Sequence, residues 1–363
     1  MTQTEPLFDG SRLALVRNLR GLLKKELAAK VSKTPAAIGQ FENGVLQPDR
    51  ATVASLALVL RVRPTFFSPR PAESKFASDA CHFRSLRSST ASERRHLLAR
   101  GALTRDLVSV LEDRVSIPSA RIPEVTTGVS SVRGAEGAAT AVRKVLGLDE
   151  APVPNVIQML ENLGVIVVPI NKGGRRVSAF STWTGDRPFI FLNNHDENPR
   201  SRTRFDNTHE LGHLVMHADT VPGDKELERQ ADRFASAFLL PKRPFLDECP
   251  SRLYWEDLIE IKKKWGASLA AIVRRGYDLG RFSEATYRRA YVDLNRRGWR
   301  RAEPGEDALP EERATLLAQT IEAAAAAGFA PEQLAVELGV SVHDLGALTS
   351  GSDLSAVGAG AAV

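Results

Sequence analysis

The sequence predicts a mainly α-helical protein with a small β-sheet, an α+β fold. Apolar residues recur at helical spacing toward both ends of the chain. Short β-rich runs bounded by Gly, Pro and Asn are confined to residues 165–193. The chain has 363 residues, 43% of them hydrophobic, which is enough for two or three domains with buried cores.

The overall composition limits the partners and the cellular compartment that we expect for this chain. Its formal net charge of +5 permits contact with nucleic acid without proving it. Cys81 and Cys249 stand far apart and form no CxxC pair, so they predict neither a metal cluster nor a disulfide framework, and a reduced, cytoplasmic setting fits best. We expect no signal peptide and no membrane span, because no apolar run of about 18 residues occurs.

Four short helices are predicted near the N-terminus, within residues 1–70. They cover residues 12–23, 24–31, 34–43 and 50–62. Thr34 is a favourable N-cap for the third helix, and Pro35 follows it at the first helical position. Gly44 ends that helix, and Pro64 ends the fourth.

The rest of the chain alternates helices with one β-rich region. Residues 71–145 are expected to be a helical connector and linker, with an amphipathic helix over 94–115 and a Pro-, Gly- and Ser-rich linker over 117–137. Residues 146–300 are expected to form one domain. A helix predicted over 137–148 leads into it from the connector. Its own predicted helices cover 155–164, 205–217, 224–241, 255–266, 268–280 and 284–298, and its strands cover 165–170, 177–183 and 188–193.

Residues 301–363 are expected to be a helical C-terminal region with a frayed tail, VGAGAAV. Within it, residues 332–351 align without gaps to residues 25–44, and both segments are predicted as helix, short turn and helix. The C-terminal copy lacks basic residues, so it does not suit phosphate binding. A tight helical hairpin can converge on this pattern by itself.

The stretch FDNTHELGHLVMH, residues 205–217, has the spacing of a metal-binding helix. His209 and His213 are four residues apart, so a helix places both imidazoles on one face, close enough to hold one ion. Glu210 lies about 100° round the helix, where it can reach a water on the metal. Zinc lowers the pKa of such a water to roughly 7, and a carboxylate can then act as its general base.

A catalytic zinc site also needs a third protein ligand. On the next predicted helix, Glu228 and Asp232 are four residues apart and share a face. Glu228 can complete a His-His-Glu site, and Asp232 can hydrogen-bond a ligating imidazole. Glu226 is the alternative third ligand. His217, one turn beyond His213, is either a fourth ligand that closes the site or a buried histidine beside it.

Residues 187–217 and 226–241 together resemble the ImmA/IrrE metallopeptidase family, and the resemblance extends over about residues 145–300. It implies Zn²⁺ bound by His209, His213 and Glu228, in the manner of a gluzincin, with Glu210 as the catalytic base. It also implies that the substrate is a regulatory protein, often a repressor.

The sequence departs from the family pattern just before the first histidine. Asp206, Asn207 and Thr208 stand where the family usually has apolar residues. This difference removes no catalytic group, but it can alter packing or access of the substrate.

Residues 24–48 and 51–67 resemble the lambda-repressor-like helix-turn-helix of the XRE family. In that fold the helix starting at Thr34 enters the major groove of DNA. Gln40 can reach an adenine or a phosphate, and Ala36 can touch a thymine methyl group. Lysines of the same region would meet phosphates, namely Lys24, Lys25 and Lys33. Base readout is thin, so sequence specificity would have to come from dimerisation, DNA shape or linker arginines.

Together the two resemblances imply a cytoplasmic regulator that binds operator DNA, as a dimer, and carries a zinc peptidase acting on a repressor or another regulatory protein. A different function remains open. The protein can be a non-catalytic regulator or antitoxin, with the HExxH domain as a sensing or partner-binding module. The helix-turn-helix can likewise serve to bind protein.

Overall fold

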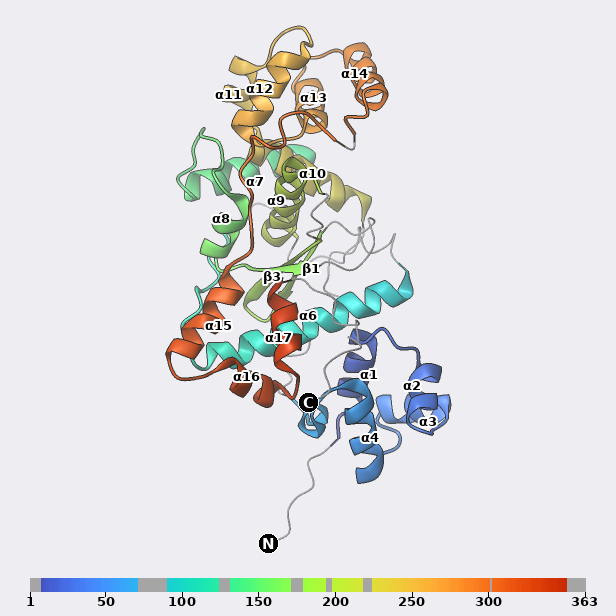
Figure 1. Cartoon of the computed structure of the whole chain (residues 1–363). Coiled ribbons are helices and arrows are strands. Elements are labelled where there is room, and N and C mark those ends of the chain that lie inside the picture. The colour runs from blue at the N-terminus through green and yellow to red at the C-terminus, as the bar shows by residue number, and fades with distance from the viewer. Residues whose placement is uncertain are drawn as a thin grey trace.

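The computed structural model describes residues 8–70, 90–123, 131–170, 179–193, 198–217, 224–300 and 302–350. Cys81 and the tail VGAGAAV lie outside these ranges, so nothing is concluded about them. The described residues confirm the mainly α-helical α+β class (Figure 1). Within them, no helix combines the length and hydropathy needed to cross a bilayer.

The four predicted N-terminal helices are present. They are α1 (Gly10–Leu19), α2 (Lys24–Lys30), α3 (Pro35–Glu42) and α4 (Arg50–Leu60), followed by a 3-10 helix, η1 (Pro64–Phe67). The hydroxyl of Thr34 accepts the N–H of Ala37 at 3.1 Å, as an N-cap does. Gly44 takes the left-handed conformation just beyond α3, with φ of +70°.

The middle of the chain is more ordered than the composition predicted. Helix α6 (Ala91–Glu112) corresponds to the predicted amphipathic helix, and α7 (Val132–Val145) starts inside the stretch predicted as a linker. The N–H of Arg121, also within that stretch, donates to the carbonyl of Leu163 at 2.9 Å. The Pro, Gly and Ser residues of this stretch correctly indicate a break between helices. They do not indicate that the backbone between the helices would hydrogen-bond to another part of the chain.

Three strands form one mixed sheet. Strand β3 (Arg187–Asn193) lies in the centre, parallel to β1 (Ile166–Ile170) and antiparallel to β2 (Ala179–Thr184). Helix α8 (Val156–Asn162) leads into β1. Every residue of β3 is buried, so the sheet is covered on both faces.

The remaining helices follow the sheet. They are α9 (Arg200–Met216), α10 (Lys225–Leu239), α11 (Lys242–Glu248), α12 (Trp255–Trp265), α13 (Leu269–Asp278), α14 (Glu284–Arg296), α15 (Leu316–Ala326), α16 (Pro331–Leu338) and α17 (Val342–Ser350). Helices α11 and α15 were not predicted individually.

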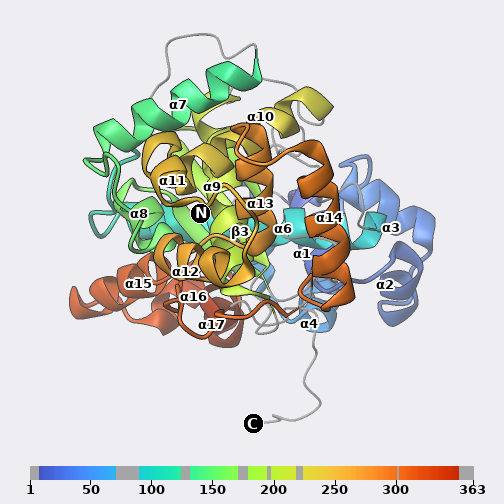
Figure 2. The same cartoon turned by 90° about the horizontal axis from the view of Figure 1, so that it is seen from above.

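The sheet separates two hydrophobic clusters of the described residues. Because neighbouring strand residues point to opposite faces, each strand contributes to both clusters. One face packs with α6, α15–α17 and the N-terminal helices, through Ile166, Val168, Phe180, Phe189 and Phe191. The other face packs with α7–α14, through Val167, Ala179, Ile190 and Leu192. In Figures 1 and 2, α9 and α10 therefore lie on one side of the sheet, with α6 and α17 on the other.

Acidic residues C-terminal to α14 hold the helices on the α9 side in place. Glu306 accepts the backbone N–H and the hydroxyl of Ser201, in the first turn of α9. Glu312 accepts the first backbone N–H groups of α8 and pairs with Arg204 of α9. A carboxylate at a helix N-terminus stabilises its unpaired N–H groups and complements the helix dipole.

Candidate metal centre

Helices α9 and α10 pack closely because of a glycine. A Cβ added to Gly212 would come within 3.1 Å of the Phe234 ring, so a larger residue would require that ring or the helix to shift. Phe234 and Phe238 are fully buried and stack with ring centroids 5.6 Å apart. This contact brings the start of α10, which carries Glu228, against the histidine face of α9.

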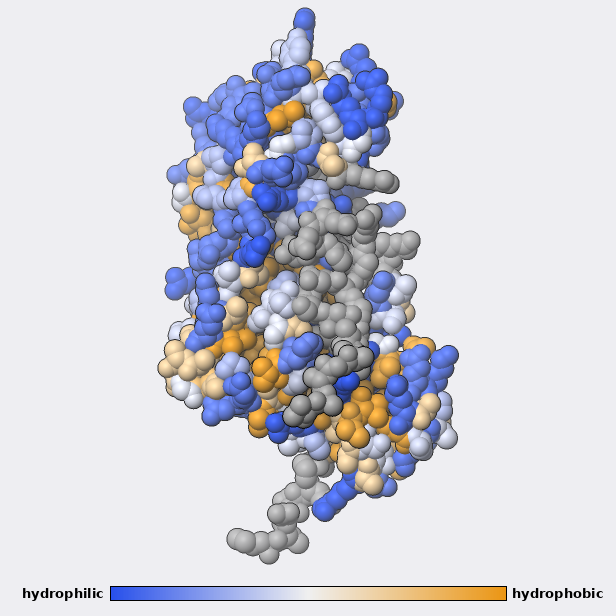
Figure 3. All heavy atoms as spheres, in the orientation of Figure 1, coloured by the Kyte–Doolittle hydropathy of each residue, from blue (hydrophilic) through white to orange (hydrophobic). Residues whose placement is uncertain are grey.

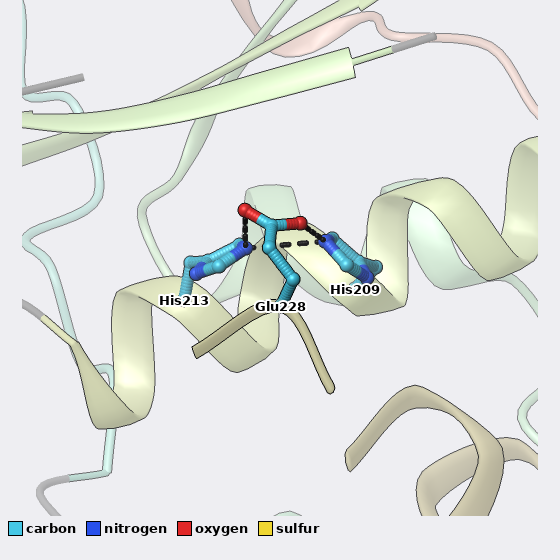
Figure 4. Close-up of side chains that lie close together, drawn as sticks. All are labelled: His209, His213 and Glu228. Atoms are coloured by element: carbon cyan, nitrogen blue, oxygen red, sulfur yellow. Dashed lines mark hydrogen bonds and ion pairs between the residues drawn. The ribbon is translucent and has the colours of Figure 1, made fainter. Parts of the chain in front are cut away.

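Among the described residues, His209, His213 and Glu228 form the group able to share a metal ion, with ligand atoms within 4.8 Å of one another. Figure 4 shows the three side chains converging, with the two Nε2 atoms 3.1 Å apart. Glu228 lies 3.4 Å from Nε2 of His209 and 3.7 Å from Nε2 of His213.

These separations suit zinc. Tetrahedral ligand atoms at about 2.0–2.1 Å from Zn²⁺ are about 3.3 Å apart. The three distances bracket that value, and two imidazoles with one carboxylate are a donor set that zinc prefers. The residues therefore fit the ion without a change of backbone.

Asp232 contacts the far side of His209. Nδ1 of His209 donates to Oδ1 of Asp232 at 2.9 Å, which leaves Nε2 directed at the other two ligands. Burial disfavours the charged imidazole, but hydrogen bonds to Asp232 and Glu228 outweigh it and raise the pKa of His209 to about 10. In the absence of a metal, the site thus favours a positive charge at the position where a cation would bind.

His217 is buried beside His213 and lies outside the three-residue ligand group. Its Nδ1 lies 3.0 Å from Nδ1 of His213, and its Nε2 lies 2.9 Å from Oε1 of Gln230. His217 therefore contacts the nitrogen of His213 that faces away from Glu228. Burial lowers the pKa of His217, which favours its neutral form.

Glu210 is anchored by the sheet. The hydroxyl of Ser181, on β2, donates to Oε2 of Glu210 at 2.6 Å. Glu210 is 6% exposed, and burial raises its pKa to about 7. A carboxyl group with this pKa can both take up and release a proton near neutral pH.

The alternative third ligand lies elsewhere. Glu226 has a side chain 43% exposed and pairs with Arg229 at 3.4 Å, whereas the side chain of Glu228 is 6% exposed and faces both imidazoles. Because the two residues are on different sides of α10, the structure places Glu228 and not Glu226 at the site.

The polar segment before the first histidine has a structural explanation. The side chains of Asn207 and Thr208 are fully buried and donate to the carbonyls of Thr203 and Arg204, one turn earlier in α9. Such bonds use the donors of these side chains within the helix itself, while Oδ1 of Asn207 is buried without a hydrogen bond to any described residue. Asp206 lies 3.6 Å from Arg202 on the helix surface.

A cavity of about 650 Å³ borders the site at Asp232. Its wall is formed by the first turns of α9 together with α10, α13 and the end of α14, and it includes Arg202, Asp206 and Tyr291. The hydroxyl of Tyr291 donates to the carbonyl of Ala270 at 3.3 Å. Asp232 therefore borders both this cavity and Nδ1 of His209.

The predicted DNA-contacting residues lie on α2, on α3 and in the turn between them, away from the metal centre (Figure 1). Most are exposed, namely Lys25, Lys33, Thr34, Ala36 and Gln40. Lys24 is only half-buried, and its Nζ lies 3.2 Å from a carboxylate oxygen of Glu42. The hydroxyl of Thr34 is already engaged as the helix cap.

Sequence reasoning missed two residues that contact the centre, Ser181 and Gln230. Ser181 is 29 positions from Glu210 and reaches it through packing of the sheet on α9, which no local pattern announces. Gln230 lies between Glu228 and Asp232, and its uncharged polar side chain among charged neighbours is the one sequence signal that could have identified it.

Family models match the two halves of this arrangement. A model described as Helix-turn-helix matches residues 13–67, and a model described as the IrrE N-terminal-like domain matches residues 160–276. The second match includes the sheet, α9 and α10, and thus the whole metal centre. No curated protein matches the chain.

Proposed function

Because the chain joins a DNA-binding helix-turn-helix domain to a domain of a metallopeptidase family, we propose that it is a cytoplasmic transcriptional regulator with a zinc-dependent endopeptidase site. Its substrate would be a regulatory protein such as a repressor. One observation carries the proposal: two imidazoles and a carboxylate meet at distances suited to zinc, with a buried carboxyl group on the adjoining helix position.

The side chains of this chain would divide the chemistry as follows. His209, His213 and Glu228 would hold the zinc, which when bound supplies Lewis acidity toward a carbonyl and water. Glu210 takes a proton from the attacking water and passes it to the leaving amine. Ser181 orients the Glu210 carboxylate by donating to Oε2.

The helix-turn-helix would deliver this site to DNA. Lys24, Lys25 and Lys33 would contact phosphates, while Ala36 and Gln40 would face bases from α3, which Thr34 caps.

On the face shown in Figure 3, apolar residues gather toward the helix-turn-helix end, and hydrophilic ones predominate over α11–α14.

We propose that the operator-bound form is a dimer. Exposed apolar side chains of the helix-turn-helix domain support it: Val45, Leu46 and Leu58 are 74%, 47% and 80% exposed. Such side chains are available to a second copy.

The second candidate is a non-catalytic regulator or antitoxin. It is favoured by the near-complete burial of the ligands, since the side chains of His213 and Glu228 are 2% and 6% exposed. In that case the metal would stabilise a sensing or partner-binding module and nothing would be cleaved.

The deciding experiment compares the full-length protein with Glu210→Gln. Zinc content is measured by mass spectrometry, and cleavage is followed on a repressor encoded beside the gene. We expect equal zinc in both proteins, and cleavage slower by about 100- to 10,000-fold in the variant, as for loss of a general base. Zinc-loaded wild type that shifts operator DNA without cleaving would favour the second candidate.

Matched variants test the ligand assignment. Glu228→Ala should lower zinc occupancy sharply, because it removes one of three ligands. Glu226→Ala, two residues away and pointing into solvent, should keep full zinc and full activity. The reverse pattern would move the third ligand to Glu226.

A further inference from the structure

The two imidazoles of the centre are supported in different ways on the side facing away from the metal. His209 meets the carboxylate of Asp232, whose side chain is 49% exposed. His213 meets another imidazole, that of His217, which in turn meets the amide of Gln230. His213, His217 and Gln230 are each no more than 2% exposed, so this second arrangement is sealed from solvent.

Metal binding by Nε2 of His213 determines the direction of every hydrogen bond in this chain. A ligating nitrogen offers its lone pair, so the proton of a neutral imidazole lies on the other nitrogen, here Nδ1. That proton is donated to Nδ1 of His217, 3.0 Å away, so His217 carries its own proton on Nε2. The Nε2 proton is then donated to Oε1 of Gln230 at 2.9 Å, and an amide oxygen can only accept.

The acceptor that Gln230 places against His217 therefore favours the tautomer in which Nε2 of His213 is free. If the position of Oε1 were taken by a donor, His217 would accept there and carry its proton on Nδ1. It would then donate to His213, whose proton would move to Nε2, the nitrogen that faces Glu228. That tautomer cannot bind a metal through Nε2.

We propose that His217 and Gln230 are positioning residues that hold His213 in the tautomer whose Nε2 binds the metal. This inference rests on the proposed zinc centre. Helix α10 thus supplies a ligand, Glu228, and the acceptors that orient both histidines, Asp232 and Gln230.

The test is the zinc dissociation constant of the full-length protein, measured by competition with a chromophoric chelator. Gln230→Leu keeps similar volume but removes the acceptor, and should weaken zinc binding by about 10- to 100-fold. Gln230→Glu keeps an acceptor oxygen at the same place and should restore the affinity to near that of the wild type.

Thr208→Val is the matched control. It removes a buried hydrogen bond from α9, to the carbonyl of Arg204, without changing the side-chain shape. Its zinc affinity should stay that of the wild type. If Gln230→Leu binds zinc as tightly as the wild type, the role of Gln230 is refuted while the zinc centre stands. If folded wild type binds no zinc, the proposed function fails and this inference fails with it.

A measurement on the wild type alone tests the proposal without relying on the folding of any variant. Long-range ¹H–¹⁵N correlation spectra of the zinc-loaded protein report which ring nitrogen of His217 carries the proton. We expect the Nε2–H form. A proton on Nδ1 would overturn the proposal even if Gln230→Leu failed to fold.

Discussion

The molecule contains two helix-turn-helix hairpins that have the same internal construction and opposite surroundings. We call α2–α3 the N-terminal hairpin and α16–α17 the C-terminal hairpin. In the gapless alignment of residues 25–44 with 332–351, core positions are buried in both hairpins. The equivalent pairs are Leu27 and Leu334, Val31 and Leu338, Ile38 and Leu345, and Phe41 and Leu348.

The backbones agree at the turn as well. Ser32 has φ of +53° and the equivalent Gly339 has φ of +73°, so both turns use a left-handed residue. The hydroxyl of Ser341 accepts the N–H of Asp344 at 3.1 Å, as Thr34 caps α3. The resemblance seen in the sequence therefore extends to caps, turn and core.

The surroundings differ. The N-terminal hairpin exposes lysines and Gln40, whereas the C-terminal hairpin docks onto the N-terminal domain. The carboxylate of Asp344 accepts two hydrogen bonds from Arg20, at 2.7 and 2.9 Å, and the carbonyl of Gly339 accepts the N–H of Arg63 at 2.8 Å. One hairpin thus leaves its basic surface exposed, while the other ties the helix-turn-helix domain to α6 and the sheet. Surface charge and close packing, not the hairpin fold, distinguish the two uses.

The largest effect should come from Asp344→Asn. Arg20 and Asp344 have side chains 7% and 3% exposed, and removing one partner of a buried pair costs about 3–5 kcal/mol. We expect urea unfolding to show that loss, with faster amide exchange in α17. Glu332→Gln, at an exposed position of the same hairpin, should change stability by about 0.5 kcal/mol or less. Equal stability of the two variants would mean that the C-terminal hairpin does not hold the domains together.

The sequence could predict interactions between residues close together along the chain, but not those between residues far apart along it. Thr34 as a cap and two histidines on one face of α9 depend on neighbours within a turn, and local spacing determines such neighbours. The bond from Ser181 to Glu210 and the pair of Arg204 with Glu312, 108 positions apart, depend on which elements pack together. Periodicity shows that a face is buried, but not what it is buried against.

The C-terminal hairpin illustrates the same limit. Its negative charge predicts no phosphate contact, which stays a prediction, and no local feature identified Arg20 as the partner of Asp344, because 324 positions separate them. Gly339 did carry a signal. It stands where the N-terminal hairpin has Ser32, and a glycine at such a position indicates either a left-handed turn or a close approach. The structure shows both.

The second prediction concerns the left-handed turn residue of each hairpin. A Cβ at Gly339 would lie 2.8 Å from the Cα of Phe66, so Gly339→Ala adds a clash to the strain of a left-handed alanine. We expect a loss of about 3 kcal/mol in chemical denaturation, from strain and overpacking together. Ser32→Gly relieves strain at an exposed turn and should change stability by less than about 1 kcal/mol. A loss of only about 1 kcal/mol in Gly339→Ala, the strain of a left-handed alanine alone, would show that the left-handed turn, rather than docking, explains the glycine.

The smallest effect on stability, and the sharpest on function, should come from Lys24→Ala combined with Lys25→Ala. Each phosphate contact releases counterions, so losing two should reduce the slope of log K against log salt concentration by up to about 1.8. Fluorescence anisotropy of operator DNA across a salt series measures that slope. Lys24 also pairs with Glu42 at 3.2 Å, so its share should be smaller than that of the exposed Lys25.

The equivalent of Lys25 in the C-terminal hairpin is Glu332, which makes Glu332→Gln the matched control here too. If the C-terminal hairpin only docks, this variant should leave the salt slope unchanged, because a residue far from phosphates releases no counterions. A slope that grows in Glu332→Gln would place the C-terminal hairpin near DNA after all. A salt slope unchanged by the double lysine substitution would instead show that these lysines of the N-terminal hairpin do not contact phosphates. The two hairpins would then not differ in DNA binding as proposed.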